Sequence, residues 1–311
     1  MQFRKFGATG IDVAPLVLGG NVFGWTTDKA ASFAILDAFM DMGFNAIDTA
    51  DVYSIFVPGH KGGESETVIG EWMQARGNRD KVVLITKGGL PMGEGLQGLS
   101  RDYLTRACEA SLARLQTEYI DVYFTHRADD TLPIGETLET LAALKTAGKI
   151  RANGCSNYTA AQLAAAVAAG EAGPGKYESF QPHYNLTWRS EYEGVPEDLC
   201  TKHDLGVITY FSLGAGFLTG KYRSKADFEG KARGGSAKMY FSEANLALLD
   251  RLDAVARRHN ATIAQIALAW LMARPSVTAP IASATSLAQL DDIMKSAEIS
   301  LTPEDLAEPE V

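Results

Sequence analysis

Cysteine is scarce in this chain: only Cys108, Cys155 and Cys200 occur among its 311 residues. Their number is odd, they lie far apart, and no Cys-x-x-Cys pair is present. A disulfide framework and a thiolate metal site are therefore not expected. The five histidines form no His-Glu-x-x-His pattern, so a metal site of that kind is not expected either.

Long hydrophobic runs and an excess of positive charge are also missing. The longest apolar stretch, Ile263–Ala273, is interrupted by Gln265 and is too short to span a bilayer. The first residues contain no apolar core of a signal peptide. The formal net charge of −9 argues against nucleic acid as the main partner. We therefore expect a cytoplasmic protein without membrane or nucleic-acid partners. The sequence leaves the oligomeric state unknown.

What the chain does contain is short apolar runs that alternate between strand and helix patterns. Residues 2–15 predict a β-hairpin with a Gly-Ala-Thr-Gly turn. The segment 213–240 is rich in glycine and predicts a long loop. Strands are predicted at 16–18, 44–47, 82–86, 120–125, 150–154, 179–180, 207–210 and 278–281. Helices are predicted at 29–42, 64–76, 100–115, 134–147, 160–169, 196–204, 243–259, 263–273 and from 286 onward.

Eight strand–helix units of this kind predict a parallel sheet, because strands that alternate with helices form βαβ units. Eight units in about 300 residues indicate a closed barrel. No change of composition separates two parts of the chain. The expected fold is therefore α/β, a single (β/α)8 TIM barrel domain over residues 1–311. A doubly wound open sheet is the alternative.

Ionisable residues stand where successive predicted strands end. Asp48, Lys87 and His126 follow three neighbouring strands, and Tyr53 lies in the loop after the first. Taken singly, such an aspartate is more often a turn or cap residue. In a parallel barrel, however, these strand ends face the same way, so we expect the four side chains to meet. A lysine ammonium lowers the pKa of a nearby tyrosine, an aspartate keeps the lysine charged, and a histidine orients a carbonyl oxygen. The set predicts general acid catalysis on a carbonyl, with Tyr53 as the proton donor.

Six motifs, in order along nearly the whole chain, resemble those of the aldo-keto reductase superfamily. Three are similar to its active-site motifs: Asn45-x-Ile47-Asp48-Thr49-Ala50-x-x-Tyr53, Leu84-Ile85-Thr86-Lys87 and Asp121-x-Tyr123-x-x-His126. Three are similar to its cofactor motifs: Gly154-x-Ser156-Asn157-Tyr158, Gln181-x-x-Tyr184-Asn185 and Gly216-x-Leu218-x-Gly220-Lys221-Tyr222. The resemblance implies that the N-terminal hairpin caps the bottom of the barrel. The long loop after the seventh strand is similar to that of bacterial-type members.

The resemblance also implies a nicotinamide cofactor and residues that bind it. Ser156, Asn157 and Gln181 would hydrogen-bond the carboxamide, and Tyr210 would stack on the nicotinamide ring. The phosphates and the adenosine would contact Ser212, Leu213, Gly216, Lys221, Arg233, Ser283, Thr285, Gln289 and Asp292. The helix that begins near Ser286 offers free N–H groups to an anion. Ser286 and Gln289 are also explained as a plain capping box.

The sequence departs from the family pattern at the phosphate end. Ser283 stands where many members have glycine, and no basic residue lies near Thr285. The loop cations, which include Arg223 and Lys231, favour NADPH (NADP+ when oxidised), and NADH remains possible. A second glycine pattern, Gly93-x-Gly95-x-x-Gly98, matches the Rossmann phosphate fingerprint. Several residues separate it from the preceding strand, so we interpret it as a loop.

We therefore predict an NAD(P)(H)-dependent oxidoreductase acting on a small-molecule carbonyl or the matching alcohol or sugar. Trp25 and Phe56 are candidates for an apolar substrate pocket, with Phe23 and Trp188 as further possibilities. The short C-terminal tail predicts an open pocket. The alternative is a cofactor-binding regulatory or redox-sensor subunit of a channel. We expect no appended N-terminal segment to act on a channel, which favours the enzyme. The substrate and the preferred direction are not readable from the sequence.

Overall fold

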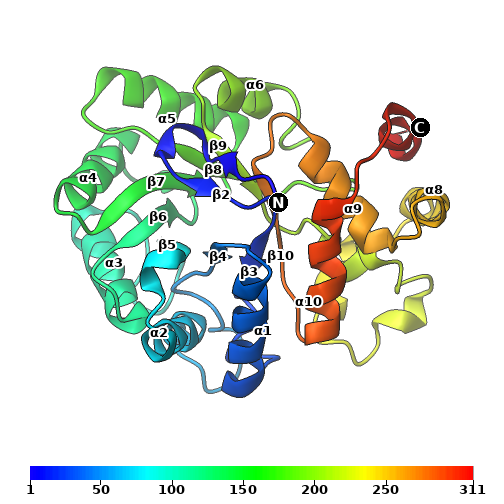
Figure 1. The fold of residues 1–311 in the computed structure, drawn as a ribbon. Coiled ribbons are helices and arrows are strands. Elements are labelled where there is room, and N and C mark those ends of the chain that lie inside the picture. Colours follow the sequence, from blue (N-terminus) through cyan, green and yellow to red (C-terminus); the bar gives the residue numbers. More distant parts are fainter. Residues whose placement is uncertain (311) are drawn as a thin grey trace.

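Short runs of buried apolar residues form eight parallel strands, which close into a barrel (Figure 1). The structure is a computed structural model that describes residues 1–310. The order of strands around the barrel follows the chain, and the last strand pairs with the first. The barrel strands are β3 (Val17–Gly19), β4 (Ala46–Asp48), β5 (Val83–Gly88), β6 (Ile120–Thr125), β7 (Ile150–Ser156), β8 (Ser179–Gln181), β9 (Gly206–Thr209) and β10 (Ala279–Ala282).

Helices connect the strands and surround the barrel (Figure 1). Several begin at a side chain that accepts a backbone N–H, as Asp28 does from Ala31 and Thr262 does from Gln265. The helices are α1 (Lys29–Asp41), α2 (Glu64–Arg76), α3 (Arg101–Leu115), α4 (Ile134–Thr146), α5 (Ala160–Ala172), α6 (Val195–Lys202), α7 (Gly234–Ala237), α8 (Glu243–Arg258), α9 (Ile263–Ala273), α10 (Leu287–Met294) and α11 (Pro303–Ala307). No helix within residues 1–310 is both long and apolar enough to cross a membrane.

Side chains alternate between two hydrophobic clusters, because successive strand residues point to opposite faces. One cluster lies between the strands and the helices and includes Leu18, Ile47 and Leu84. The other fills the barrel interior with Val17, Ala46, Val83, Ile85, Val122, Phe124, Ala152, Ile208, Ala279 and Ile281. The barrel interior is therefore a packed core.

The N-terminal hairpin, β1 (Arg4–Lys5) and β2 (Asp12–Val13), closes one end of the barrel. Its residues Phe6, Ile11 and Val13 belong to the interior cluster. A Cβ placed on Gly206, at the start of β9, would lie 2.2 Å from the Phe6 ring, so only glycine admits this approach. The hairpin covers the end where the strands begin, which leaves the opposite end for the polar strand termini.

The closed barrel and the hairpin confirm the sequence-based fold, and the doubly wound alternative is wrong. Most strand boundaries differ from the prediction by one or two residues. Four polar residues predicted to follow their strands are inside β4, β5, β7 and β8, since each forms a ladder pair with a neighbouring strand: Asp48 with Gly19, Lys87 with Phe124, and Ser156 with Gln181. Polar residues at strand ends can join a ladder because pairing uses only the backbone.

The segment 213–240 is more ordered than a long glycine-rich loop. It contains α7 and the 3-10 turns Gly214–Thr219, Lys225–Phe228 and Lys238–Tyr240. Tyr222, Phe228 and Tyr240 are buried, and the rings of Tyr222 and Phe228 stack with centroids 4.5 Å apart. These aromatics give the segment a small core of its own. The Gly93–Gly98 stretch lies between β5 and α3 outside any helix or strand, which confirms that it is a loop.

Candidate active site

Side-chain alternation brings polar residues into the barrel mouth. Ala46 and Ile85 belong to the interior cluster, so residues two positions later also point inward. Four strands carry such a polar residue at or next to their last position: Asp48 ends β4, Lys87 is the next-to-last residue of β5, Ser156 ends β7 and Gln181 ends β8. His126 and Tyr210 follow β6 and β9 directly. The mouth is therefore polar immediately above an apolar barrel core.

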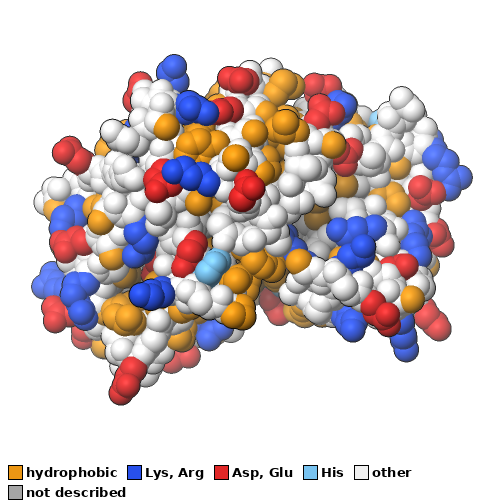
Figure 2. All heavy atoms as spheres, turned by 90° about the horizontal axis from the view of Figure 1, so that it is seen from below, with side chains coloured by type: hydrophobic (Ala, Val, Ile, Leu, Met, Phe, Trp, Pro, Cys, Tyr) orange, Lys and Arg blue, Asp and Glu red, His pale blue; other side chains and the backbone are white. Residues whose placement is uncertain are grey.

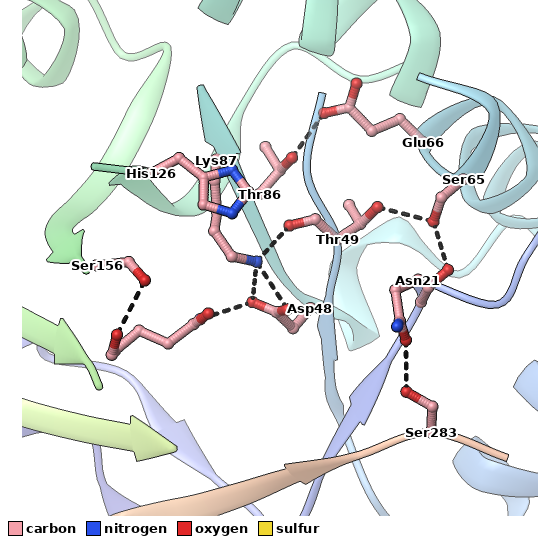
Figure 3. Close-up of polar contacts among 12 residues, drawn as sticks. Asn21, Asp48, Thr49, Ser65, Glu66, Thr86, Lys87, His126, Ser156 and Ser283 are labelled. Carbon is pink, nitrogen blue, oxygen red and sulfur yellow. Dashed lines mark hydrogen bonds and ion pairs between the residues drawn. The ribbon is translucent and has the colours of Figure 1, made fainter. Parts of the chain in front are cut away.

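Lys87 and Asp48 form a buried ion pair at the centre of this mouth (Figure 3). Lys87 Nζ lies 2.8 Å from Asp48 Oδ1, 2.7 Å from Asp48 Oδ2 and 2.7 Å from the carbonyl oxygen of Thr49. Gln181 Nε2 donates to Asp48 Oδ1 at 2.9 Å. The ammonium and the carboxylate are thus both held by several partners. Removing either one would leave the other as an uncompensated buried charge.

Tyr53 lies beside this pair. Lys87 Nζ is 5.2 Å from the centre of the Tyr53 ring. Burial alone would lower the pKa of Lys87, but Asp48 and Tyr53 outweigh burial and raise it, so the ammonium stays charged. Burial raises the pKa of Tyr53 above its ordinary value, while Lys87 acts to lower it. The sequence analysis correctly predicted that Lys87 lowers the pKa of Tyr53. It did not predict that burial raises this pKa by more, which keeps Tyr53 protonated.

His126 lies near the Lys87–Asp48 pair, and its imidazole is neutral. Burial lowers the pKa of His126 well below its ordinary value, and the charges of Lys87 and Arg127 lower it further. The ring of Tyr53 meets the His126 ring edge to face, with centroids 6.1 Å apart. Nδ1 of His126 is buried and has no hydrogen-bond partner in the described part of the chain. An unpartnered N–H costs more than an unpartnered lone pair, so we assign the proton to Nε2.

The four residues expected at the nicotinamide are neighbours. Ser156 Oγ donates to the carbonyl oxygen of Gln181 at 2.9 Å. Asn157 Nδ2 donates to the carbonyl oxygen of His126 at 2.9 Å, and Asn157 Oδ1 accepts from the Tyr210 hydroxyl at 2.6 Å. Because Nε2 of Gln181 is directed at Asp48, its Oε1 is the atom left to accept a hydrogen bond.

One cavity of about 920 Å³ opens at this mouth. Lys87 is buried and does not line it, whereas most of the other residues singled out from the sequence do. They are Trp25, Asp48, Tyr53, Phe56, His126, Ser156, Asn157, Gln181, Tyr210, Ser212, Leu213, Gly216, Lys221, Arg233, Ser283, Thr285, Gln289 and Asp292. Residues from seven of the eight strand ends and from the segment 213–240 thus share a single space.

Cations gather at the part of the cavity formed by the segment 213–240. Lys221, Lys231 and Arg233 line it. Burial lowers the pKa of Lys221, and the nearby charges of Arg233 and Lys231 lower it further. Nη2 of Arg233 is buried without a partner among the described residues. Arg223 is different: it pairs with Asp250 at 2.6 Å and does not line the cavity. Seen from below the view of Figure 1, the surface is cut by a notch with Lys and Arg side chains on one flank (Figure 2).

At the other end of the cavity, the first turn of α10 differs from the expected capping box. Ser286 accepts from the backbone N–H of Gln289, as expected of an N-cap. Oε1 of Gln289 does not return to Ser286 but accepts from the N–H (2.9 Å) and the hydroxyl (3.0 Å) of Thr285. Asp292 accepts from Gln265 Nε2 at 2.8 Å. Thr285 and Gln289 are therefore fixed to each other at the cavity wall.

Trp25 and Phe56 form an edge-to-face aromatic pair at the cavity, with centroids 4.8 Å apart. Two further pocket candidates are wrong. Phe23 is fully buried in the outer core, and Trp188 packs against His183 away from the cavity lining. Both aromatic rings pack against residues that the sequence alone does not identify as their neighbours.

Asn21 lines the cavity and was missed in the sequence. It accepts a hydrogen bond from Ser283 Oγ at 2.7 Å, across the seam between β3 and β10 (Figure 3). It stands just beyond Gly19-Gly20 at the end of β3, so the rule used for the other strand ends would have found it. Within residues 1–310, no three His, Cys, Asp or Glu side chains are grouped to hold a metal ion.

Comparison with known proteins agrees with this geometry. The chain matches the aldo/keto reductase family over residues 15–310. It is 33% identical to the uncharacterized oxidoreductase YrpG of Bacillus subtilis, over 98% of this chain and 93% of the relative. It is 32% identical to a probable voltage-gated potassium channel subunit beta of Arabidopsis thaliana, over 97% and 94%. It is 31% identical to the L-glyceraldehyde 3-phosphate reductase of Escherichia coli O157:H7, over 99% and 91%. The chain therefore belongs to the aldo/keto reductase family and is an oxidoreductase of that family's type.

Proposed function

We propose that this protein is an NADP(H)-dependent oxidoreductase with Tyr53 as general acid and base, which reduces aldehyde or ketone carbonyls with NADPH or oxidises the matching alcohols or sugars with NADP+. The observation that carries the proposal is the buried Lys87–Asp48 pair directly beside Tyr53, at the mouth of a cavity with cations on one side. We infer that one domain, residues 1–311, carries the activity. We also infer that it acts in the cytoplasm, which suits its three free, buried cysteines.

Tyr53 holds the proton that a reduced carbonyl must receive. When bound, the nicotinamide supplies the hydride, which leaves negative charge on the substrate oxygen. Tyr53 gives its hydroxyl proton to that oxygen, and the Lys87 ammonium stabilises the phenolate that remains. Asp48 and Thr49 fix the ammonium in place. The Nε2–H of neutral His126 donates to the substrate oxygen and orients the carbonyl.

The residues around the cavity fit a dinucleotide. Gln181 Oε1, Ser156 and Asn157 would bind the carboxamide and Tyr210 would stack on the nicotinamide ring, a proposal supported by the hydrogen bonds that hold these residues together at the mouth. Lys221, Lys231 and the unpartnered Nη2 of Arg233 supply positive charge for phosphates. Cations of this number favour NADPH over NADH, although no basic residue lies at Thr285. The remaining contacts proposed for the phosphates and adenosine are Ser212, Leu213, Gly216, Ser283, Thr285, Gln289 and Asp292.

The substrate pocket is open. Phe56 is 60% exposed and Trp25 packs on its edge, so the pair forms an apolar rim without enclosing a large ligand. The named E. coli relative reduces a small phosphorylated aldehyde, which supports a search among small aldehydes, ketones and sugars. A screen of these compounds with both cofactors would identify the substrate class.

Replacing Tyr53 by phenylalanine tests the proposal. We expect Tyr53→Phe to lower kcat for carbonyl reduction by about 10²- to 10⁴-fold, since it removes only the transferable proton. The dissociation constant of NADPH should change little, because the ring remains. Turnover and NADPH titration are measured on the same preparation. Unchanged turnover in the variant would refute the role of Tyr53.

A cofactor-binding regulatory subunit is the second candidate. It is supported by the similarity to a probable potassium channel subunit beta of A. thaliana. The two candidates differ in turnover: an enzyme oxidises NADPH rapidly with some carbonyl compound, whereas a sensor binds NADPH and reduces every tested aldehyde no faster than background. The intact set of Asp48, Tyr53, Lys87 and His126 is compatible with both.

A further inference from the structure

His183 occupies a position that the proposed reaction leaves unassigned. It lies two residues after Gln181, on the extension of β8, and forms a parallel bridge with Tyr210 just after β9. Both residues therefore sit side by side at the rim of the barrel mouth. His183 is only 8% exposed. Burial lowers the pKa of His183 to about 4, so the ring is neutral at physiological pH.

The His183 ring is the middle layer of an aromatic stack. Trp188 stacks on one side, with centroids 4.7 Å apart and planes 9° apart. Tyr210 stacks on the other, with centroids 5.2 Å apart and planes 25° apart. The hydroxyl of Tyr210 is fixed separately by Asn157 at 2.6 Å. His183 thus packs against one face of the Tyr210 ring, and the opposite face is the one that we propose stacks on the nicotinamide.

The same imidazole is bonded to the segment 213–240. Nε2 of His183 lies 2.7 Å from the Tyr240 hydroxyl, and both side chains are buried. Tyr240 ends the segment, and its ring also packs against Phe217, with centroids 6.3 Å apart. The cavity cations Lys221, Lys231 and Arg233 belong to this segment. One hydrogen bond therefore connects the phosphate side of the cavity to the ring stack on its nicotinamide side.

We propose that His183 is a positioning residue that couples the segment 213–240 to Tyr210, so that holding the cofactor phosphates and seating the nicotinamide ring depend on each other. The inference rests on the proposed function, because it takes Tyr210 as the stacking residue. A buried hydrogen bond between two neutral groups can provide such coupling. If either His183 or Tyr240 moves away, the other is left buried without a hydrogen-bond partner, which is costly, so the two sides move together.

Two substitutions remove the same hydrogen bond from opposite ends. His183→Phe keeps an aromatic ring in the stack, and Tyr240→Phe keeps the imidazole. We expect each to raise the NADPH dissociation rate about tenfold. The double variant should dissociate no faster than either single variant, since both substitutions remove the same His183–Tyr240 hydrogen bond. Stopped-flow release of NADPH measures the rates.

A third variant separates the contribution of the His183 ring from that of its hydrogen bond to Tyr240. His183→Gln places an amide near the position of Nε2 but removes the flat ring behind Tyr210. We expect it to keep a near-normal NADPH dissociation rate and to lose kcat. The matched control is Tyr192→Phe, which removes another buried tyrosine hydroxyl, one that bonds the carbonyl oxygen of Ser276 at 3.1 Å and not His183 or the segment 213–240. The control should change neither the dissociation rate nor kcat.

The outcomes distinguish the inference from the proposed function. If the wild-type protein binds neither NADPH nor NADH, the proposed function is wrong. If it binds and turns over normally, additive effects of His183→Phe and Tyr240→Phe would overturn the coupling. So would an unchanged dissociation rate in Tyr240→Phe. Thermal melting of each variant accompanies the kinetics, because a purely structural role would lower the melting temperature and leave the dissociation rate as it was.

Discussion

At the scale of single residues, Lys87 carries the most consequence for the site. Its ammonium is buried and its charge is balanced by one carboxylate, Asp48. Taking two charges out of water is costly, and their attraction offsets that cost only while both are present. A buried ion pair of this kind is therefore weak evidence for stability. The Lys87–Asp48 pair is better explained by its proposed effect on the acid chemistry of the neighbouring Tyr53.

Replacing Lys87 by methionine separates these two effects. We expect Lys87→Met to abolish most carbonyl reduction, since the phenolate of Tyr53 loses its stabilising charge. We also expect the free energy of unfolding to fall by about 3 kcal/mol, because Asp48 is left as an uncompensated buried carboxylate. Adding Asp48→Asn should restore much of the stability without restoring activity. Urea unfolding and turnover measure the two effects, and full activity in Lys87→Met would contradict the assignment.

Asp51 is a second buried carboxyl with a different character. Neither of its oxygens has a hydrogen-bond partner in the described residues. Burial, together with the nearby Glu66 carboxylate, raises the pKa of Asp51 to about 8. Glu66 itself is held by Thr86 and Arg114 at 2.6 Å each. Asp51 is thus protonated in the folded protein at neutral pH, whereas it ionises freely in the unfolded chain.

This difference predicts a stabilising substitution. The folded-state pKa of Asp51 lies above the unfolded one, so its favourable contribution is complete below about pH 4 and is lost as the pH rises toward 8. Asp51→Asn has nearly the same shape and cannot ionise. We expect it to raise the free energy of unfolding at pH 7 by about 2 kcal/mol and to flatten the fall of stability between about pH 5 and 8. A lower stability at pH 7 than wild type would contradict the neutral state of Asp51.

At the scale of elements, the strand ends and the hairpin divide the barrel into two functional ends. The hairpin supplies apolar side chains to one end, and the strand termini supply polar ones to the other. Because side chains alternate along each strand, a residue that points inward near the hairpin fixes which later residues point into the mouth. The site is therefore set by strand register, which the interior core maintains.

The hairpin should contribute to stability without contributing to the site. Phe6 is fully buried in the interior cluster and packs at the start of β9. We expect Phe6→Ala to lower the free energy of unfolding by about 3 to 5 kcal/mol, through lost burial and a residual cavity. The NADPH dissociation constant should stay near the wild-type value, provided that it is measured well below the melting temperature. A selective loss of NADPH affinity would show that the hairpin influences the mouth directly.

The elements also show where sequence patterns succeed. The strand–helix alternation predicted every barrel strand, since buried β-branched runs and capped helices are local features. The segment 213–240 was predicted only as a loop. Its short turns are stabilised by contacts such as the Tyr222–Phe228 stack and the Phe217–Tyr240 pair. Contacts of this kind leave no periodicity in the sequence.

At the scale of the whole molecule, charge is distributed unevenly. The chain carries a formal net charge of −9, yet Lys221, Lys231 and Arg233 line one side of the cavity. A cavity with partly buried cations attracts anions although the protein has a negative net charge, because nearby charges outweigh distant charges that the solvent screens. These cations suit the phosphates of the cofactor that we propose.

Cofactor preference follows from this distribution. We expect NADPH to bind about tenfold more tightly than NADH, a difference of about 1.4 kcal/mol, because of its additional phosphate. Raising the ionic strength from about 20 to about 500 mM should weaken NADPH binding more than NADH binding, since salt screens the added charge. Fluorescence titration at both salt concentrations measures the four constants. A clear preference for NADH would refute the proposed cofactor.

The sequence by itself determined the order of elements, the closed barrel and the residues at the strand ends. Periodicity, helix caps and strand termini each depend on residues that are close together in the chain. From it, Asp48, Lys87 and His126 were expected to meet, and they do. Only the tertiary structure decided that burial keeps Tyr53 protonated, that Phe23 and Trp188 lie outside the pocket, and that His183 links two sides of the cavity. Those outcomes depend on which side chains surround a group in space, and burial and partners of that kind arise only when distant segments pack together.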